Sequence, residues 1–442
     1  MLAEMLFDAE IYRLTLWTAL LVLGIVAFWN LIYIRGRKKV LNEVYSDYEP
    51  SVSVVIPAFN EQKTIAKTLK NIFDSDYPPG SLEILVVNDG STDKTEKNVK
   101  DFIKKFDARN IVKIINMKAN VGKCAALNFG VEHASGEVVI TTDADTIFNK
   151  DSVRKLVAGF ADEKVGAIAG YYKANQSLTF SDAIRFLKHH DFKKFSHYFL
   201  EKFQNLEYIL FLFTRKRQEI LDAIMVVPGA IGAFRKDVLR KIGGFDEKIL
   251  IEDYDITLKV HKAGYLVKCY KDAEASTTPP QTWKELIGQR IRWYRGGLQV
   301  MAKHSDLLRS RHGFVSFVFG FEYVNVVLQF LIWSLFFSGI FYKVFILQES
   351  ILFLLMQWIN RIISLQFQLF DYILFVAAVL FLIGMFEAIQ SVKLSRASRK
   401  TLLFYPLLGI YAMFLGYVWL YSFLAHVTRR KISYAGRGWK GR

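Results

Sequence analysis

The feature that most constrains this chain is an uncharged apolar segment near its N-terminus. Residues 14–34 contain no acidic or basic side chain and are long enough to cross a bilayer as a helix. Only Arg13 precedes the segment as a cation, whereas four cations follow it at once: Arg35, Arg37, Lys38 and Lys39. Because the cytoplasmic flanks of spans are rich in Lys and Arg, we expect the N-terminus outside and the next domain in the cytoplasm. A removable signal peptide is the alternative, but the sequence lacks its basic leading region and small-residue cleavage site.

The C-terminal third is also apolar, so residues 1–40 and 313–428 predict membrane segments on both sides of a middle domain. Strongly apolar blocks cover 314–346, 370–391 and 401–426, and a weaker block covers 350–368, which gives three to four segments. Both flanks of the last block are basic, so one simple crossing cannot satisfy the charge rule at both ends. We expect Pro406 to break this block into a re-entrant element, and the basic tail, 429–442, to be cytoplasmic.

Residues 41–282 have a different pattern, in which short apolar runs alternate with polar, helix-like stretches. Strands are predicted at 51–59, 82–89, 111–116 and 137–143, and helices at 61–73 and 122–134. This alternation predicts an α/β domain with a mostly parallel sheet. Ligands bind such sheets at the carboxyl ends of the strands. Asn60, Asp89 and Asp143 come at or just after predicted strand ends and are therefore candidate site residues.

Composition argues against other classes of protein. The net charge of +16 comes from scattered cations without a groove-reading motif, so we expect basic membrane flanks and no binding of nucleic acid. Cys124 and Cys269 have no metal-site spacing and do not suggest a disulfide framework. This cysteine usage is compatible with a reduced, cytoplasmic domain.

Two carboxylates separated by one residue, Asp143 and Asp145, follow the fourth predicted strand. At a turn they can bind one hard cation, and Mg²⁺ or Mn²⁺ accepts oxygen ligands from both protein and phosphate. Asp89 adds a carboxylate at the end of a second strand of the same sheet edge. Solvated turns would also explain each of these acids taken alone.

Two further segments carry charges with a chemical use. Lys123 opens a predicted helix, where a cation opposes the helix dipole unless an anion such as a diphosphate binds there. Glu252 and Asp253 precede a helical apolar pattern, and a carboxylate there could deprotonate an acceptor hydroxyl as a general base. A surface lysine and an acidic helix N-terminus are the structural alternatives.

Residues 283–312 mix aromatic, aliphatic and basic side chains, which predicts an amphipathic helix at the membrane surface. Within it, Trp293 offers a flat apolar face to a sugar ring, and Arg292 can bind phosphate oxygens in bidentate geometry. An interfacial helix alone would explain the Trp and the Arg but not Gln289.

Taken in order, these motifs resemble those of the membrane-bound family 2 inverting glycosyltransferases, which include the cellulose, chitin, hyaluronan and poly-N-acetylglucosamine synthases. The resemblance covers residues 50–300, and the flanking spans agree with it. Its motifs are Pro57-Ala58-Phe59-Asn60-Glu61, Asp89-Gly90-Ser91, Gly122-Lys123, Asp143-x-Asp145, Glu252-Asp253 and Gln289-x-x-Arg292-Trp293. Weaker matches are Gln204, Glu207-Tyr208, the loop 228–232 and Trp439-x-x-Arg442.

The resemblance implies a GT-A fold, a Rossmann-like α/β domain, that binds a UDP-sugar and a divalent metal, Mg²⁺ or Mn²⁺. Asp253 would be the catalytic base, Trp293, Gly229 and Glu252 would face the acceptor, and Asp143 and Asp145 would hold the metal. The implied donor-binding residues are Pro57, Ala58, Asn60, Glu61, Asp89, Lys123, Asp143, Asp145, Gln289 and Arg292. Among these, the loop 57–61 and Asp89 would hold the uracil, and Lys123 would contact the diphosphate.

The implied activity is inverting transfer that forms a β-glycosidic linkage, in processive polysaccharide synthesis coupled to membrane translocation. A polysaccharide or a lipid would be the acceptor, and a non-processive enzyme making a glycolipid is the closest alternative. Ile251 stands where polymer synthases usually carry Thr, and the loop 228–232 lacks their Cys or Ser, so the acceptor stays open. A transporter or scaffold with an inactive domain is a further alternative, against which the set of carboxylates argues. We expect a multi-pass plasma-membrane protein with a cytoplasmic catalytic domain; its protein partners are unknown.

Overall fold

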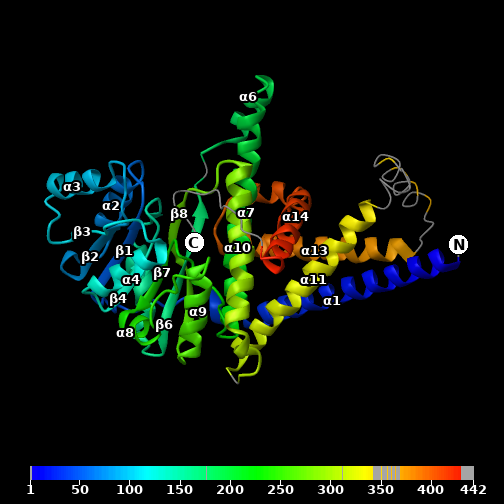
Figure 1. Cartoon of the computed structure of the whole chain (residues 1–442), viewed down its shortest axis with the longest axis horizontal. Coiled ribbons are helices and arrows are strands. Elements are labelled where there is room, and N and C mark those ends of the chain that lie inside the picture. The colour runs from blue at the N-terminus through cyan, green and yellow to red at the C-terminus, as the bar shows by residue number, and fades with distance from the viewer. Residues whose placement is uncertain are drawn as a thin grey trace.

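The computed structural model describes residues 2–175, 177–310, 312–341, 350, 356, 360, 364 and 369–429. These residues form an α/β domain and a set of long helices (Figure 1). The helices α1 (Leu2–Leu41), α11 (Phe314–Phe341) and α13 (Leu369–Leu394) extend away from the sheet. Between them and the sheet stand α7 (Phe192–Ile220) and α10 (Trp283–Lys303).

The four predicted strands are confirmed, with ends that differ by one or two residues. They are β1 (Val52–Ala58), β2 (Leu82–Asn88), β3 (Val112–Asn116) and β4 (Val138–Thr141). Every residue of β1, β2 and β4 is buried, as expected for apolar strands covered by helices on both faces. The intervening helices are α2 (Ile65–Phe73), α3 (Thr95–Lys105) and α4 (Lys123–His133).

The sheet is mixed, with the strand order β3-β2-β1-β4-β7-β6-β8-β5. Strands β1 to β4 pair in parallel, as predicted, but β7 (Gly232–Arg235) runs antiparallel to β4 and to β6 (Val165–Ala174). Strand β8 (Leu266–Thr277) pairs in parallel with β6 and antiparallel with β5 (Ile147–Phe148). The sequence did not predict β5 to β8, two of which are very short.

The two faces of β1 show why helices cover both sides of the sheet. Val54 and Ile56 belong to a buried cluster with residues of α2, whereas Val55 packs against residues of α4 on the other face. Alternate side chains of a strand point to opposite faces, so one apolar run supplies two cores. The loops that follow the carboxyl ends of β1, β2 and β4 contain Asn60, Asp89 and Asp143 of the candidate site.

Among the described residues, three helices are long and apolar enough to cross a membrane: Leu20–Leu41, Phe314–Ile332 and Leu408–Val427. Two coincide with the predicted segments 14–34 and 314–346. The predicted block 401–426 is interrupted, because a turn around Pro406 separates η5 (Arg399–Phe404) from α14 (Leu408–Val427). Proline has no N–H for a helical hydrogen bond, which accounts for the interruption. The block 350–368, apart from four single residues, and the tail with Trp439 and Arg442 lie outside the described residues.

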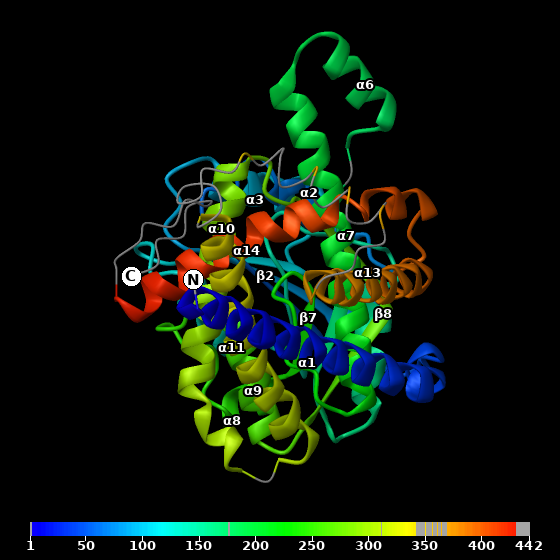
Figure 2. The same ribbon diagram turned by 90° about the vertical axis from the view of Figure 1, so that its right-hand side faces the viewer.

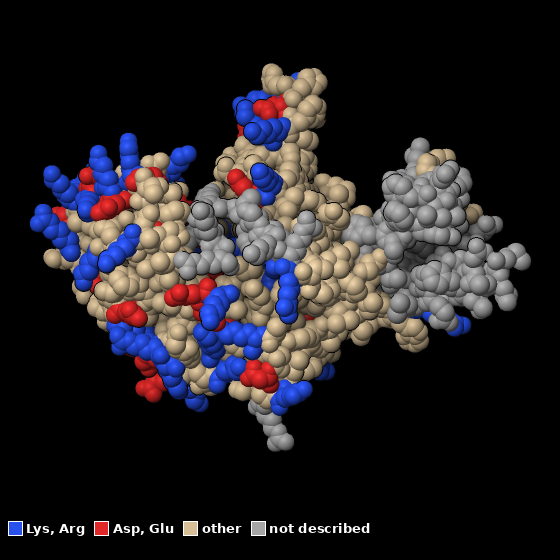
Figure 3. Space-filling model, viewed as in Figure 1, with Lys and Arg blue, Asp and Glu red and all other residues tan. Residues whose placement is uncertain are grey.

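The helices also pack on one another and on the catalytic domain. Helix α13 lies along α1 and also contacts α7, and α14 contacts both α10 and α11 (Figures 1 and 2). Charged side chains gather on the α/β domain and on the projecting helix α6 (Phe180–Lys188), whereas the described surface over α11, α13 and α14 is largely uncharged in this view (Figure 3). This division of charge fits a polar catalytic domain attached to a membrane region.

Candidate active site

Lys123 brings two of the predicted acidic segments together. Its Nζ atom lies 2.7 Å from Oδ1 of Asp143 and 2.8 Å from Oε1 of Glu252. Lys123 is the first residue of α4, and Glu252 is the first residue of α9 (Glu252–Lys262), so two helix N-termini meet at this point. Burial alone would lower the pKa of Lys123, but Asp143 and Glu252 raise it above its usual value. The lysine is therefore a permanent cation.

Asp253 is the second residue of α9, and its surroundings favour the neutral form of its side chain. Burial and the neighbouring charge of Glu252 raise its pKa to about 6, although Lys123 and Arg292 oppose the shift. For Glu252, burial is outweighed by Lys123 and Arg292, so the pKa of that carboxyl is lowered. Two adjacent acids thus divide their roles. Glu252 stays ionised in an ion pair, and Asp253 can exchange a proton near neutral pH.

Gly229 lies against the same ion pair. A Cβ atom at this position would lie 3.2 Å from Nζ of Lys123 and 3.4 Å from Oε1 of Glu252. The loop 228–232 is held to the end of β4, because the hydroxyl of Thr142 donates to the carbonyl of Ala230 at 2.9 Å. The predicted acceptor loop therefore lies beside Glu252, the residue that precedes the predicted base.

The loops after β1 and β2 are joined by short polar contacts. Oδ1 of Asn60 accepts from the N–H of Thr92 at 2.9 Å, and the N–H of Asn60 donates to Oγ of Ser91 at 3.0 Å. Asn60 has a φ of 58°, a left-handed conformation that Asn tolerates better than most residues. Pro57 and Ala58 are the last residues of β1, and the N–H of Glu61 donates to Oγ1 of Thr95 at 2.8 Å.

Asp89 is completely buried and connects β2 to the start of α4. Its two carboxylate oxygens accept from the N–H groups of Val121 at 2.9 Å and Gly122 at 3.0 Å. Burial raises the pKa of Asp89, and these two hydrogen bonds counteract the increase. Asp89 therefore holds the backbone that presents Lys123.

Asp143 and Asp145 come just after β4, where the sequence predicts the metal site. Asp143 pairs with Lys123, and Oδ1 of Asp145 accepts from the hydroxyl of Thr277 at 3.4 Å. The part of the chain that the structure describes contains no group of three or more His, Cys, Asp or Glu side chains arranged for a metal. Two carboxylates nevertheless fit a hard cation that completes its coordination with phosphate oxygens and water.

The predicted segment from Gln289 to Trp293 belongs to α10, which packs against α9. Nη1 of Arg292 donates to the carbonyl of Leu250 at 3.2 Å, just before Glu252 and Asp253. Gln289 and Trp293 both contact Arg290, whose guanidinium carbon lies 4.1 Å from the centre of the Trp293 ring. Gln204 is buried on α7 and donates to the carbonyl of Pro280 at 2.9 Å, just before α10 begins.

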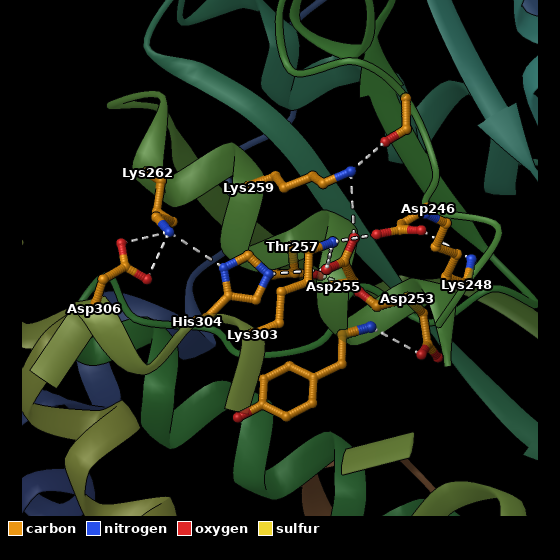
Figure 4. Close-up of polar contacts among 12 residues, drawn as sticks. Asp246, Lys248, Asp253, Asp255, Thr257, Lys259, Lys262, Lys303, His304 and Asp306 are labelled. Atoms are coloured by element: carbon orange, nitrogen blue, oxygen red, sulfur yellow. Dashed lines mark hydrogen bonds and ion pairs between the residues drawn. The ribbon is translucent and has the colours of Figure 1, made fainter. Parts of the chain in front are cut away.

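A cluster of charges that no sequence pattern indicated joins α9 to α10 (Figure 4). Oδ1 of the fully buried Asp255 contacts Nζ of Lys303 at 2.6 Å and Nε2 of His304 at 2.9 Å. Lys303 also reaches Asp246 at 2.7 Å. Burial would raise the pKa of Asp255, but His304 and Lys303 lower it to about 2. Asp255 is close to Asp253 in sequence, yet no local pattern indicates that its partners lie on another helix.

Known proteins match this chain in sequence. The model of glycosyl transferase family 2 matches residues 53–243, and that of glycosyl transferase family 21 matches residues 217–386. "Probable glycosyltransferase YdaM" of Bacillus subtilis is 36% identical over 282 residues, 62% of this chain and 62% of that protein. A poly-beta-1,6-N-acetyl-D-glucosamine synthase of Staphylococcus epidermidis is 30% identical over 254 residues, 57% of this chain and 56% of that protein. These two alignments thus span less than two thirds of the relatives' length.

A solved structure agrees with the fold. The mannosyltransferase PcManGT from Pyrobaculum calidifontis, in complex with GDP-Man and Mn²⁺, has a TM-score of 0.58 at 21% identity. The match covers 82% of this chain and 98% of that one. The predicted GT-A fold is confirmed, with three candidate membrane helices beside it among the described residues, and at this identity the likeness concerns the fold alone.

Proposed function

We propose that this chain, which belongs to the membrane-bound family 2 glycosyltransferases, transfers a sugar from a UDP-sugar to an acceptor hydroxyl with inversion. The observation that carries the proposal is the contact of one cation, Lys123, with both Asp143 and Glu252, which brings the Asp143 motif to the acidic start of α9, where Asp253 lies. This arrangement offers one proton acceptor near neutral pH and a positive group at the predicted position of the leaving diphosphate.

In the proposed reaction, Asp253 is the general base. The acceptor O–H proton passes to its carboxylate while the acceptor oxygen attacks the anomeric carbon on the face opposite the diphosphate. The bond between that carbon and the diphosphate oxygen breaks, and UDP leaves with the electron pair. Because a single displacement inverts the anomeric carbon, an α-linked donor gives a β-linked product, and no covalent enzyme intermediate is required.

The donor side would use the two joined loops and the cations. The loop 57–61 and Asp89 would bind the uridine, and Lys123, Gln289 and Arg292 would surround the diphosphate. Asp143 and Asp145 would hold a Mg²⁺ or Mn²⁺ ion, which would neutralise developing charge on the leaving group when bound. Lys123 would balance charge there as well, because it already pairs with Asp143.

On the acceptor side, Trp293, Gly229 and Glu252 would surround the sugar that receives the transfer. We propose a polysaccharide as the product, extended processively and coupled to translocation across the membrane. The poly-beta-1,6-N-acetyl-D-glucosamine synthases among the relatives make UDP-N-acetylglucosamine the first donor to test. The relatives' names alone do not separate this function from that of a glycolipid-forming enzyme.

The location is part of the proposal. Residues 1–40 would form an anchor, 41–282 the cytoplasmic catalytic domain, 283–312 an interfacial helix, and 313–428 the C-terminal membrane region. The basic tail, 429–442, would be cytoplasmic, and the protein would lie in the plasma membrane.

The test uses full-length protein in nanodiscs with a panel of UDP-sugars and one GDP-sugar. We expect UDP release and a β-linked product with one UDP-sugar, and a ladder or smear on a gel; a single glycolipid spot would favour the non-processive alternative. Asp253→Asn should abolish transfer while UDP binding, measured by calorimetry, stays largely intact. Asp101→Asn, the same change at an exposed position of α3, is the matched control. Normal turnover of Asp253→Asn would rule out the base assignment.

A further inference from the structure

Arg290 lies within the α10 motif that runs from Gln289 to Trp293. It is buried, and it has no role in the proposed reaction. Its side chain is 1% exposed. Nη1 donates to Oε1 of Gln289 at 2.7 Å, and the guanidinium carbon lies 4.1 Å from the centre of the Trp293 ring. One guanidinium therefore contacts a residue proposed for the donor and a residue proposed for the acceptor.

The opposite side of the guanidinium is anchored on two other helices. Nη2 of Arg290 donates to the carboxylate of Glu207 on α7. The same carboxylate oxygen accepts from the hydroxyl of Tyr411 on α14 at 3.2 Å. Tyr411 is 3% exposed, and its ring stacks on Phe203 of α7 at 5.1 Å. Burial raises the pKa of Glu207, and the positive charge of Arg290 counteracts that rise. The ionised form of Glu207 therefore depends on its contact with Arg290.

Stability alone does not account for this arrangement. A buried ion pair often stabilises a fold no more than apolar residues of similar volume would, because both charges lose their hydration. A planar guanidinium can, however, hold an amide by a hydrogen bond and an aromatic ring by its flat face at the same time, which an ammonium cannot. Phe211 flanks Trp293 as well, with ring centres 6.3 Å apart, so the indole contacts α7 and Arg290 together.

We propose that Arg290 is a positioning residue, which fixes the side chains of Gln289 and Trp293 and is itself held by Glu207 and by Tyr411 of the membrane helix α14. The inference rests on the proposed function for the ligands of Gln289 and Trp293. The claim that Arg290 fixes the orientation of these two side chains does not depend on it. Through Tyr411, Glu207 and Arg290, a helix that is apolar enough to span the membrane is connected to Trp293, which we propose faces the acceptor.

The first test is Arg290→Lys in full-length protein, which keeps the buried charge but loses the flat face and the contact with Gln289. Transfer to acceptor, relative to hydrolysis of the donor by water, should fall about three- to thirtyfold, with a higher KM for the acceptor. Tyr411→Phe leaves the ion pair in place and should cause a smaller change, about two- to threefold, in the same direction. Lys284→Gln, at an exposed cation of the same helix, is the control and should change neither quantity.

A second readout does not need activity. Acrylamide quenching of the indole, taken as the difference between each protein and its Trp293→Phe version, should increase in Arg290→Lys and in Tyr411→Phe. Unchanged quenching and an unchanged ratio of transfer to hydrolysis would overturn the inference. If the wild type neither transfers nor hydrolyses any donor, the proposed function fails, and quenching still decides whether Arg290 orders Trp293. If Arg290→Lys fails to fold, Tyr411→Phe carries both measurements.

Discussion

The Nζ atom of Lys123 and the Oε1 atom of Glu252 lie 2.8 Å apart, and their ion pair joins the first residue of α4 to the first residue of α9. Both helix N-termini carry partial positive charge, which favours anions between them. Because Asp253 follows Glu252 on α9, the pair also brings the group proposed to neutralise the diphosphate next to the neighbour of the proposed base. Substitution of either partner should therefore change the pKa of Asp253.

The pH dependence of transfer should follow Asp253. Because its carboxylate must be ionised to act as a base and its pKa is about 6, kcat/KM should fall as the pH decreases through that value. Glu252→Gln removes a charge that raises this pKa, so the acid limb should move to lower pH. Lys123→Met removes a charge that lowers it, so the limb should move to higher pH. Shifts of the same sign in both variants would contradict this account.

Asp253→Asn should stabilise the folded protein at alkaline pH. The pKa of Asp253 is raised from 3.8 to about 6, so its ionised form costs stability above the folded-state pKa and costs none below the unfolded-state value. At pH 8 the gain should be roughly 1–3 kcal/mol, and it should vanish near pH 4. Thermal denaturation in detergent at the two pH values measures it. A variant that is less stable at pH 8 would contradict the assignment.

Gly229→Ala should weaken the site without unfolding the protein. The new Cβ atom would lie 3.2 Å from Nζ of Lys123, a distance that requires the lysine or the loop to move. We expect a several-fold loss of kcat/KM and little change in thermal stability. Gly80→Ala, where no atom lies within 4 Å of the added Cβ, is the control. Wild-type kinetics for Gly229→Ala would show that the loop adapts freely.

Asp255→Asn should loosen the contact between α9 and α10. Its pKa of about 2 means that Asp255 contributes stability above its unfolded-state pKa of 3.8, and that the contribution disappears as the pH falls towards 2. Loss of the charge should cost about 2 kcal/mol at pH 7, seen as a lower melting temperature. Asp306→Asn removes a more exposed acid of the same cluster, paired with Lys262, and should change stability by less than about 0.5 kcal/mol.

The orientation in the membrane can be tested at Lys97, an exposed residue of α3. If the catalytic domain is cytoplasmic, Lys97→Cys should resist an impermeant maleimide in intact cells and react after lysis. Cys269 is buried and Cys124 is half-buried, so the native thiols should give little background. Labelling of Lys97→Cys in intact cells would reverse the proposed topology.

Local patterns were sufficient to place many of the candidate residues at strand ends and helix starts. The apolar runs predicted β1 to β4, and the acids and amide that follow them lie at one sheet edge because parallel strands share their carboxyl ends. Lys123 and Glu252 were selected as charges at helix starts, and both are the first residues of their helices. The strands from β5 onwards were missed. The two-residue β5 is too short for a period, and the four-residue β7, Gly-Ala-Phe-Arg, lacks the continuous apolar run of the equally short β4. Strand β8 mixes buried and half-buried positions without strict alternation.

The sequence by itself determined which segments are apolar enough for a membrane, which form the parallel half of the sheet, and which residues are candidates for the chemistry. These properties depend on neighbours in the chain. Only the tertiary structure decided that Lys123 pairs with Glu252 and that Asp255 contacts His304. It also decided that Tyr411 of the last described helix supports Arg290 through Glu207. Those contacts join helices far apart in sequence, and a pKa such as that of Asp253 is set by burial and charges that exist only once the helices have packed.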